Sequence, residues 1–202
     1  MNESEKERQW QAEQETFLAL TEGRLKDACL SMASFEASRA FPRGLGIDWR
    51  KYDCNRDLTI LQVIFTTHLK RLVSFDENII LRLRVTASMM HLWGTNKPYM
   101  PSPWLPTDGR DWAVDSRMLL FSALNAVNLQ KIKRMRFKQV KVVASGLPGI
   151  CSTCRSENGK IYPIDTAPVL PHETCRCKMG CGCIIVVVEP GDDEEDLVPI
   201  GL

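Results

Sequence analysis

The chain has 202 residues, of which 44% are hydrophobic, so it is long enough to bury a core of its own. Its 26 lysines and arginines nearly balance its 25 aspartates and glutamates, and the formal net charge is +1. This balance excludes binding to nucleic acid or to a membrane surface through overall charge. The charged N-terminus is followed by no apolar segment, and no apolar run approaches the length of a bilayer span. We therefore expect a cytoplasmic protein with no membrane partner.

Apolar residues with helical periodicity predict a helical region over residues 1–93. A first stripe covers residues 3–39, and Gly23 is expected to split it into two helices. Asp57 is a candidate N-cap for the next helix, which should extend to about residue 72.

One more helix is predicted before residue 94. Ser74 and Glu77 have the spacing of a capping box and precede an apolar run, so they are expected to open this helix. Gly94 should end it, because glycine readily adopts the left-handed conformation of a helix C-terminus.

Residues 94–110 carry four prolines and are predicted to be a connector, since proline interrupts both helices and central strands. Tyr99 and Trp104 are expected to fix this connector to the surface. A long helix over residues 111–137 follows, and it should pack on the helical region because it is apolar on most sides.

The hydrophobic period changes after residue 137. Three short β-branched runs, at residues 140–143, 160–164 and 184–188, predict three strands within a module that spans residues 138–189. Residues 190–202 form an acidic block that is expected to stay flexible. The predicted fold class is α+β, mainly α: a helical domain, a small β zinc ribbon and a disordered acidic tail.

Cysteines concentrate in the predicted β module, where six of the eight lie between positions 151 and 183. Cys151 and Cys154 form a Cys-x-x-Cys pair, which can direct two thiolates at one tetrahedral ion. The remaining four are arranged as two Cys-x-Cys pairs, and residues two apart on an extended chain point to opposite faces. We therefore expect one member of each pair to bind a structural Zn²⁺. The favoured ligands are Cys151, Cys154, Cys175 and Cys181, with Cys183, Cys177 and His172 as alternates.

Other uses of these cysteines remain open at this stage. They include an iron–sulfur cluster, a redox dithiol, disulfides and free thiols, although the spacing matches no common cluster pattern. His172 and Glu173 lack the second histidine of a zinc protease helix, and no deaminase signature is present. Neither catalysis nor a small-molecule substrate is therefore expected.

A run of basic residues provides the one local charge feature. Its cations could bind phosphates. Alternatively, they could interact favourably with the dipole at a helix C-terminus and lie on the solvated face of a strand. The run comprises Lys131, Lys133, Arg134, Arg136, Lys138 and Lys141.

Several motifs occur in an order that resembles a known family. A strand ending in Val-Val-Ala-Ser-Gly is followed by Cys151-x-x-Cys154, by Gly-Lys-Ile-Tyr, by Leu-Pro-His ending at His172, and by Cys-Arg-Cys at residues 175–177. This order resembles the C-terminal part of phage head morphogenesis proteins, the minor capsid group with Mu F-like and SPP1 gp7-like members. The similarity covers about residues 111–189, and the pair at 181 and 183 departs from the family pattern.

The resemblance implies a non-enzymatic structural or assembly role, with capsid or portal proteins as partners and location in the virion or in the bacterial cytoplasm. The alternative is a nucleic-acid-binding zinc-ribbon protein that uses the basic run. Steep loss of affinity with salt would distinguish the second function from the first.

Overall fold

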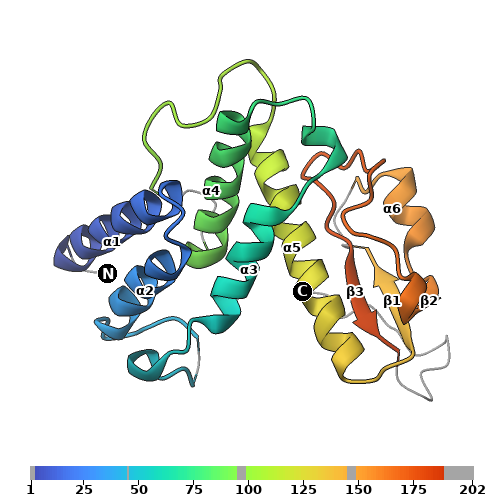
Figure 1. Cartoon of the computed structure of the whole chain (residues 1–202), viewed down its shortest axis with the longest axis horizontal. Helices are drawn as coiled ribbons and strands as arrows, with labels where there is room; N and C mark the ends of the chain where they lie inside the picture. Colours follow the sequence, from blue (N-terminus) through green and yellow to red (C-terminus); the bar gives the residue numbers. More distant parts are fainter. Residues whose placement is uncertain (1–2, 45, 95–98, 145–148, 189–202) are drawn as a thin grey trace. The chain divides into compact units, whose positions relative to one another are not determined.

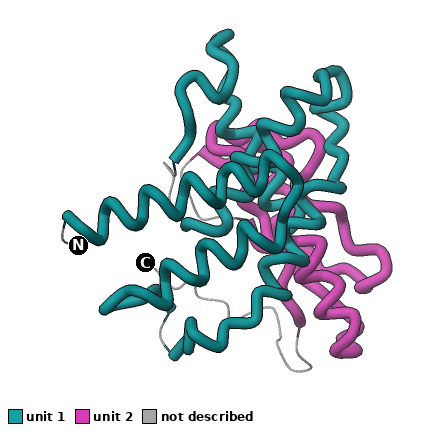
Figure 2. The backbone as a smooth tube through the Cα atoms, turned by 60° about the vertical axis from the view of Figure 1, so that its left-hand side comes forward, with its two compact units in different colours: residues 1–124 teal, residues 125–202 magenta. Residues whose placement is uncertain are grey.

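The computed structural model describes residues 3–44, 46–94, 99–144 and 149–188 (Figure 1). The chain forms two compact units, residues 1–124 and residues 125–202, and the boundary lies inside helix α5 (Trp112–Arg134) (Figure 2). The first unit is helical, and the second contains the only sheet in the described part of the chain. The predicted α+β, mainly α class is confirmed. The predicted acidic tail, residues 190–202, lies outside the described residues.

Four helices build the first unit before α5 begins. They are α1 (Glu3–Thr21), α2 (Leu25–Ala37), α3 (Asn55–Thr66) and α4 (Glu77–Trp93), with 3-10 turns η1 (Trp49–Lys51) and η2 (Lys70–Leu72) between them. Gly23 separates α1 from α2, as the sequence predicts, and its φ of 73° is one that glycine adopts without a steric penalty. Among the described helices, none is long and apolar enough to cross a bilayer.

The N-terminus of α3 corrects the sequence prediction. Cys54 occupies the N-cap position, so Asp57 lies inside the first turn. Asp57 accepts hydrogen bonds from Tyr52 and from Nε2 of His91, and the His91 contact measures 2.9 Å. The carboxylate therefore serves a tertiary contact, which periodicity along one helix could not reveal.

The predicted capping box of α4 is also wrong at its first residue. The helix begins at Glu77, and an N-cap residue must directly precede the first helical residue, so Asp76 takes that place. Oδ1 of Asp76 accepts a hydrogen bond from the backbone N–H of Ile79 at 2.9 Å. Gly94 ends the helix with φ 57°, as predicted.

Packing between α1, α2, α3 and α4 forms the core of the first unit. Leu20 and Leu61 are among the side chains with no exposed surface. The connector is fixed as predicted, because the ring of Phe17 contacts the rings of Tyr99 and Trp104 edge-on, and Nε1 of Trp104 donates to a carbonyl of α4 at 3.2 Å. Other buried members of this core are Phe17, Ala28, Cys29, Met32, Phe35, Val85, Met89, Leu92 and Trp93.

The second unit contains the three predicted strands. They are β1 (Gln139–Val143), β2 (Ile161–Pro163) and β3 (Ile184–Val187), in the order β2-β1-β3 with both pairings antiparallel. Val140 and Val142 of β1 and Ile185 of β3 are buried, so alternate residues of the strands form the core of this unit.

The C-terminal turns of α5 belong to the same unit and lie against β3. Nδ2 of Asn125 donates to the carbonyl of Cys183 at 3.2 Å, and Nδ2 of Asn128 donates to the carbonyl of Ile185 at 2.9 Å. Asn125 is buried and its amide is paired, as a buried polar group requires. These two bonds fix the start of β3 to the helix.

The segment between Cys154 and Cys175 forms no hairpin of its own. It contains the rest of helix α6 (Ser152–Glu157), strand β2 and the 3-10 turn η3 (Ile164–Thr166), and β2 pairs with β1, which precedes the first cysteine of the motif. The runs of β-branched residues predicted the strands but did not specify which strand pairs with which.

Candidate metal centre

Six cysteines from distant parts of the second unit bring their sulfurs together. Two groups satisfy the condition that all sulfurs lie within 4.8 Å of one another. We call Cys151, Cys154, Cys175 and Cys177 the first sulfur group, and Cys154, Cys181 and Cys183 the second sulfur group. None of the six forms a disulfide bond within the described part of the chain. The cluster can hold a metal ion, because thiolates are the preferred ligands of soft metal ions.

Helix α6 positions the first two cysteines. Cys151 is its N-cap residue and Cys154 lies in its first turn, so the helical path brings both sulfurs to the same end of the helix. The hydroxyl of Thr153 lies 3.2 Å from that of Thr174, which links α6 to the segment that carries Cys175. At the other end of the helix, Oδ1 of Asn158 accepts from the N–H of Ala144, just after β1, at 2.9 Å. The Cys-x-x-Cys pair is thus held at both sides.

Turns position the next two cysteines. The N–H of Cys175 donates to the carbonyl of His172 at 3.0 Å, and the N–H of Gly180 donates to the carbonyl of Cys177 at 3.0 Å. The segment is therefore folded back on itself and is not extended. This is why both Cys175 and Cys177 turn inward, whereas the alternation expected of an extended chain would have admitted only one of them.

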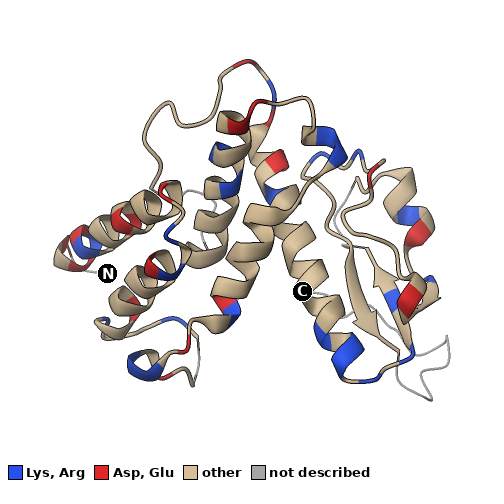
Figure 3. Ribbon diagram, viewed as in Figure 1, with Lys and Arg blue, Asp and Glu red and all other residues tan. Residues whose placement is uncertain are grey.

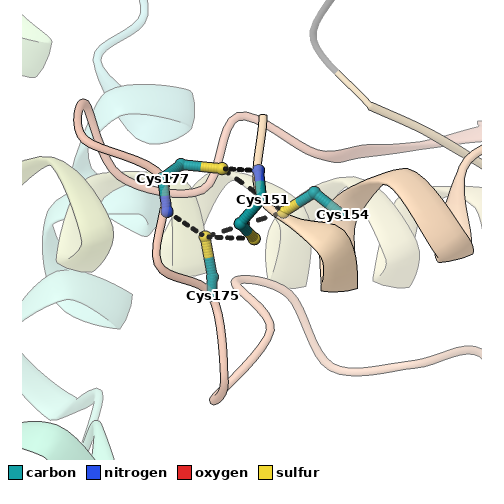
Figure 4. Close-up of side chains that lie close together, drawn as sticks. All are labelled: Cys151, Cys154, Cys175 and Cys177. Atoms are coloured by element: carbon teal, nitrogen blue, oxygen red, sulfur yellow. Dashed lines mark hydrogen bonds between the residues drawn. The ribbon is translucent and has the colours of Figure 1, made fainter. Parts of the chain in front are cut away.

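The sulfur–sulfur distances in the first group match a tetrahedral thiolate site. Sγ of Cys154 lies 3.6 Å from that of Cys175 and 3.7 Å from that of Cys177, and the sulfurs of Cys151 and Cys175 are 3.9 Å apart (Figure 4). A Zn–S bond of roughly 2.3 Å gives a tetrahedron whose edges are roughly 3.8 Å. In the close-up the four side chains point toward a common centre.

Backbone N–H groups point at the sulfurs of this group. The N–H of Cys151 donates to Sγ of Cys177 at 3.2 Å, and the N–H of Cys177 donates to Sγ of Cys175 at 3.4 Å. Such donors favour the ionised sulfur, which is the form that binds a metal. The loop geometry therefore prepares sulfurs for coordination.

Several thiols of the cluster have shifted pKa values. Burial opposes ionisation of Cys151, but N–H groups of Cys154 and Arg176 together with neighbouring sulfurs lower its pKa to about 6. A hydrogen bond from Cys183 lowers the pKa of Cys181 to about 5 against the effect of burial, whereas burial raises the pKa of Cys175 to about 12. Each sulfur group thus contains one thiol that ionises easily.

The second sulfur group is fully buried. The exposed fractions of Cys154, Cys181 and Cys183 are 1%, 0% and 2%. The sulfur of Cys154 lies 3.8 Å from that of Cys181, so Cys154 stands at tetrahedral edge distance from members of both groups.

The structure brings together three of the four ligands favoured from sequence. Cys151, Cys154 and Cys175 lie in the first group, where Cys177, one of the alternates, is the fourth sulfur. Cys181 lies with Cys183 in the second group. His172 is buried, with 8% of its surface exposed, and belongs to neither group. Nothing local to the sequence distinguished Cys177 from Cys181, since the turn at Cys175 depends on the folded loop.

The basic run lies at the surface of the second unit and follows the end of α5 into β1 (Figure 3). Five of its residues are exposed and Lys141 is half-buried. Nζ of Lys133 lies 3.7 Å from a carboxylate oxygen of Asp165, and that carboxylate is itself largely exposed. Arg136, just past α5, has a φ of 61°, in the left-handed region.

Sequence reasoning missed a half-buried hydrogen-bonded group in the first unit, formed by Asp57, His91 and Tyr52. Burial alone would raise the pKa of Asp57, but hydrogen bonds from His91 and Tyr52 outweigh it and lower the pKa. Burial, with Asp57 nearby, raises the pKa of the Cys29 thiol to about 12, so this thiol stays protonated. Asp57 and His91 are too far apart in sequence for any local pattern to pair them.

No protein-family model, curated protein or solved structure matches this chain. Its chemistry is therefore inferred from the residues and their arrangement.

Proposed function

We propose that the first sulfur group binds one Zn²⁺ ion whose function is to hold the second unit together. The observation that carries the proposal is the agreement between three of the six sulfur–sulfur distances, 3.6, 3.7 and 3.9 Å, and the edge of a tetrahedral zinc–thiolate site. Zinc fits this donor set because it takes four thiolates in a tetrahedron and has no redox chemistry of its own.

The proposed role is structural and not catalytic. Four thiolates fill the coordination sphere of zinc and leave no position at which water could be activated. The ion would link α6 to the turns at Cys175 and Cys177, segments that also meet through the hydroxyls of Thr153 and Thr174. Structural zinc contributes roughly 10–16 kcal/mol in small sites, which is more than short strands supply by themselves.

Metal analysis of single-residue variants tests this proposal. The reduced wild-type protein should carry zinc by mass spectrometry, and Cys151→Ser should lose zinc and expose the remaining thiols to a thiol reagent. Cys54→Ser is the matched control, because Cys54 is buried in the first unit and serine is a good N-cap residue for α3. The control should keep its zinc. A Cys151→Ser protein with undiminished zinc would rule out this site.

The wider biological role is proposed from the resemblance to phage head morphogenesis proteins. The Leu-Pro-His and Cys-Arg-Cys motifs that carry the resemblance include Cys175 and Cys177 of the proposed site. We propose a structural or assembly role in virions, with zinc keeping a docking module rigid. Mass spectrometry of particles purified after prophage induction in the host should detect the protein. Its absence from both procapsids and mature particles would contradict this role.

Nucleic-acid binding through the basic run is the alternative function. Five cations in the last turns of α5 and in the segment that leads to β1 are exposed. Their exposure supports this function, because phosphate contacts need accessible charges. The affinity for a DNA duplex should then fall steeply between about 50 and 200 mM salt. Replacing Lys131, Lys133 and Arg134 with glutamine should abolish the salt-dependent binding, and an unchanged affinity would exclude this surface.

A further inference from the structure

Cys181 and Cys183 of the second sulfur group are not needed by the ion proposed above, yet the group has the features of a metal site. Its three sulfurs lie within 4.8 Å of one another, and all three side chains are at most 2% exposed.

The second group is held on well-anchored backbone. Gly180 makes a turn with φ 85°, which favours glycine, directly before Cys181. The carbonyl of Cys183 accepts a hydrogen bond from the buried Asn125, and β3 begins at the next residue. The sulfurs are therefore kept close together by the fold, and a metal ion would not have to order them.

Cys154 connects the two groups. Its sulfur is 3.6 Å from Cys175 in the first group and 3.8 Å from Cys181 in the second. A thiolate has enough lone pairs to bind two metal ions at once. The first group offers four sulfurs and the second offers three, so six cysteines fill seven donor positions when Cys154 is shared. Both distances correspond to a tetrahedral edge of roughly 3.8 Å.

We propose that the second sulfur group binds a second zinc ion, and that the sulfur of Cys154 bridges the two ions. This inference rests on the proposed function of the first group and extends it to a two-metal thiolate centre. The second ion would neutralise buried thiolates that are otherwise costly in an apolar interior.

His172 is the candidate for the fourth ligand of the second ion. It is 8% exposed, and its Nε2 is buried without a hydrogen-bond partner among the described residues. Its carbonyl accepts from the N–H of Cys175 at 3.0 Å, so His172 lies in the turn that carries Cys175. Neutral imidazole completes many zinc–thiolate sites, so rotation of this ring toward the ion would close the tetrahedron.

Zinc stoichiometry separates this inference from the proposed function. Wild-type protein, reduced, loaded with zinc and freed of excess metal, should hold two zinc ions per chain. The pair variant Cys181→Ser/Cys183→Ser should hold one, as should Cys151→Ser/Cys177→Ser, while the Cys54→Ser control should hold two. His172→Ala should release one of its two ions to a weak chelator sooner than wild type.

The outcomes are distinguishable. One zinc per wild-type chain, undiminished in Cys181→Ser/Cys183→Ser, overturns the second site and leaves the proposed function intact. One zinc that is lost only in Cys181→Ser/Cys183→Ser overturns the proposed function. If His172→Ala retains both zinc ions as firmly as wild type, His172 is not the fourth ligand of the second ion.

A spectroscopic test needs no variant and so does not depend on whether a variant folds. The wild-type protein is reconstituted with ¹¹³Cd²⁺, which replaces zinc in thiolate sites, and its ¹¹³Cd NMR spectrum is recorded. Two resonances with a cadmium–cadmium coupling are expected, because a bridging sulfur transmits coupling between the two nuclei. Two uncoupled resonances would exclude the bridge through Cys154, and a single resonance would exclude the second ion.

Discussion

The two units reach stability by different means. The first unit has a continuous apolar core between four helices, with its buried carboxylates paired: Glu36 with Arg43 at 2.6 Å, and Asp115 with two arginines at 2.7 Å each. The second unit has three strands of three to five residues and a cluster of six cysteines. A helical unit of this length can bury enough apolar surface to fold, whereas a sheet this small needs a further staple.

From this difference we expect that the proposed metal and the apolar core stabilise separate parts of one chain. Removal of metal should affect the second unit, and truncation of core side chains should affect the first. The following predictions test that separation, beginning with the largest expected effect.

Chelation of the metal should unfold the second unit and leave the first folded. Structural zinc is worth roughly 10–16 kcal/mol, so its loss exceeds the stability of a small sheet. Hydrogen exchange should show loss of protection in β1 and β3 after chelator is added to the reduced protein, with protection kept in α1 and α4. Zinc added back should restore the strands. Equal loss of protection in both units would contradict the separation.

Truncation of a core leucine should destabilise the first unit without releasing metal. Leu20 is fully buried, so Leu20→Ala should cost about 2–5 kcal/mol, the range for a buried leucine. Leu18 in the same helix is 54% exposed, and Leu18→Ala should change stability by less than about 0.5 kcal/mol. Urea denaturation followed by the helical signal measures both. Zinc loss in Leu20→Ala would show that the units depend on each other.

The carboxylate of Asp57 should make the first unit sensitive to acid. Its pKa is lowered in the folded state, so its contribution is complete above the unfolded value of about 3.9 and is lost as pH falls through the folded pKa. Asp57→Asn should cost about 1.5–3 kcal/mol at pH 7, as expected for hydrogen bonds to a charged group. The difference from wild type, measured by urea denaturation, should shrink below about pH 4. If the difference in unfolding free energy between wild type and Asp57→Asn stays constant from pH 7 to pH 3, the ionised carboxylate of Asp57 is not the source of the stabilisation.

Substitutions at the N-cap of α4 should have the smallest effect on stability. They also distinguish between the two candidate N-cap residues, Asp76 and Ser74. Asp76→Ala should cost about 1 kcal/mol, because Asp76 accepts from the N–H of Ile79. Ser74→Ala, at the position that the sequence pattern favoured, should be nearly neutral. Thermal unfolding of the two variants measures the difference. A larger loss of stability in Ser74→Ala than in Asp76→Ala would show that Ser74 is the N-cap residue.

The sequence was informative wherever neighbouring residues decide the structure. The period of the apolar residues predicted the helices of the first unit, Gly23 and Gly94 marked helix ends, and β-branched runs marked all three strands. The concentration of cysteines predicted the location of the candidate metal centre. These features depend on backbone preferences and on side-chain period, which act over a few residues.

The tertiary structure decided which groups meet. It paired Asp57 with His91, paired β2 with β1, and turned both Cys175 and Cys177 toward Cys154. It also placed Cys181 and Cys183 beside the same sulfur, which made a second ion a reasonable inference. Spacing along a chain limits how far apart two residues can be, but their approach depends on the packing of everything between them, and that is a property of the whole fold.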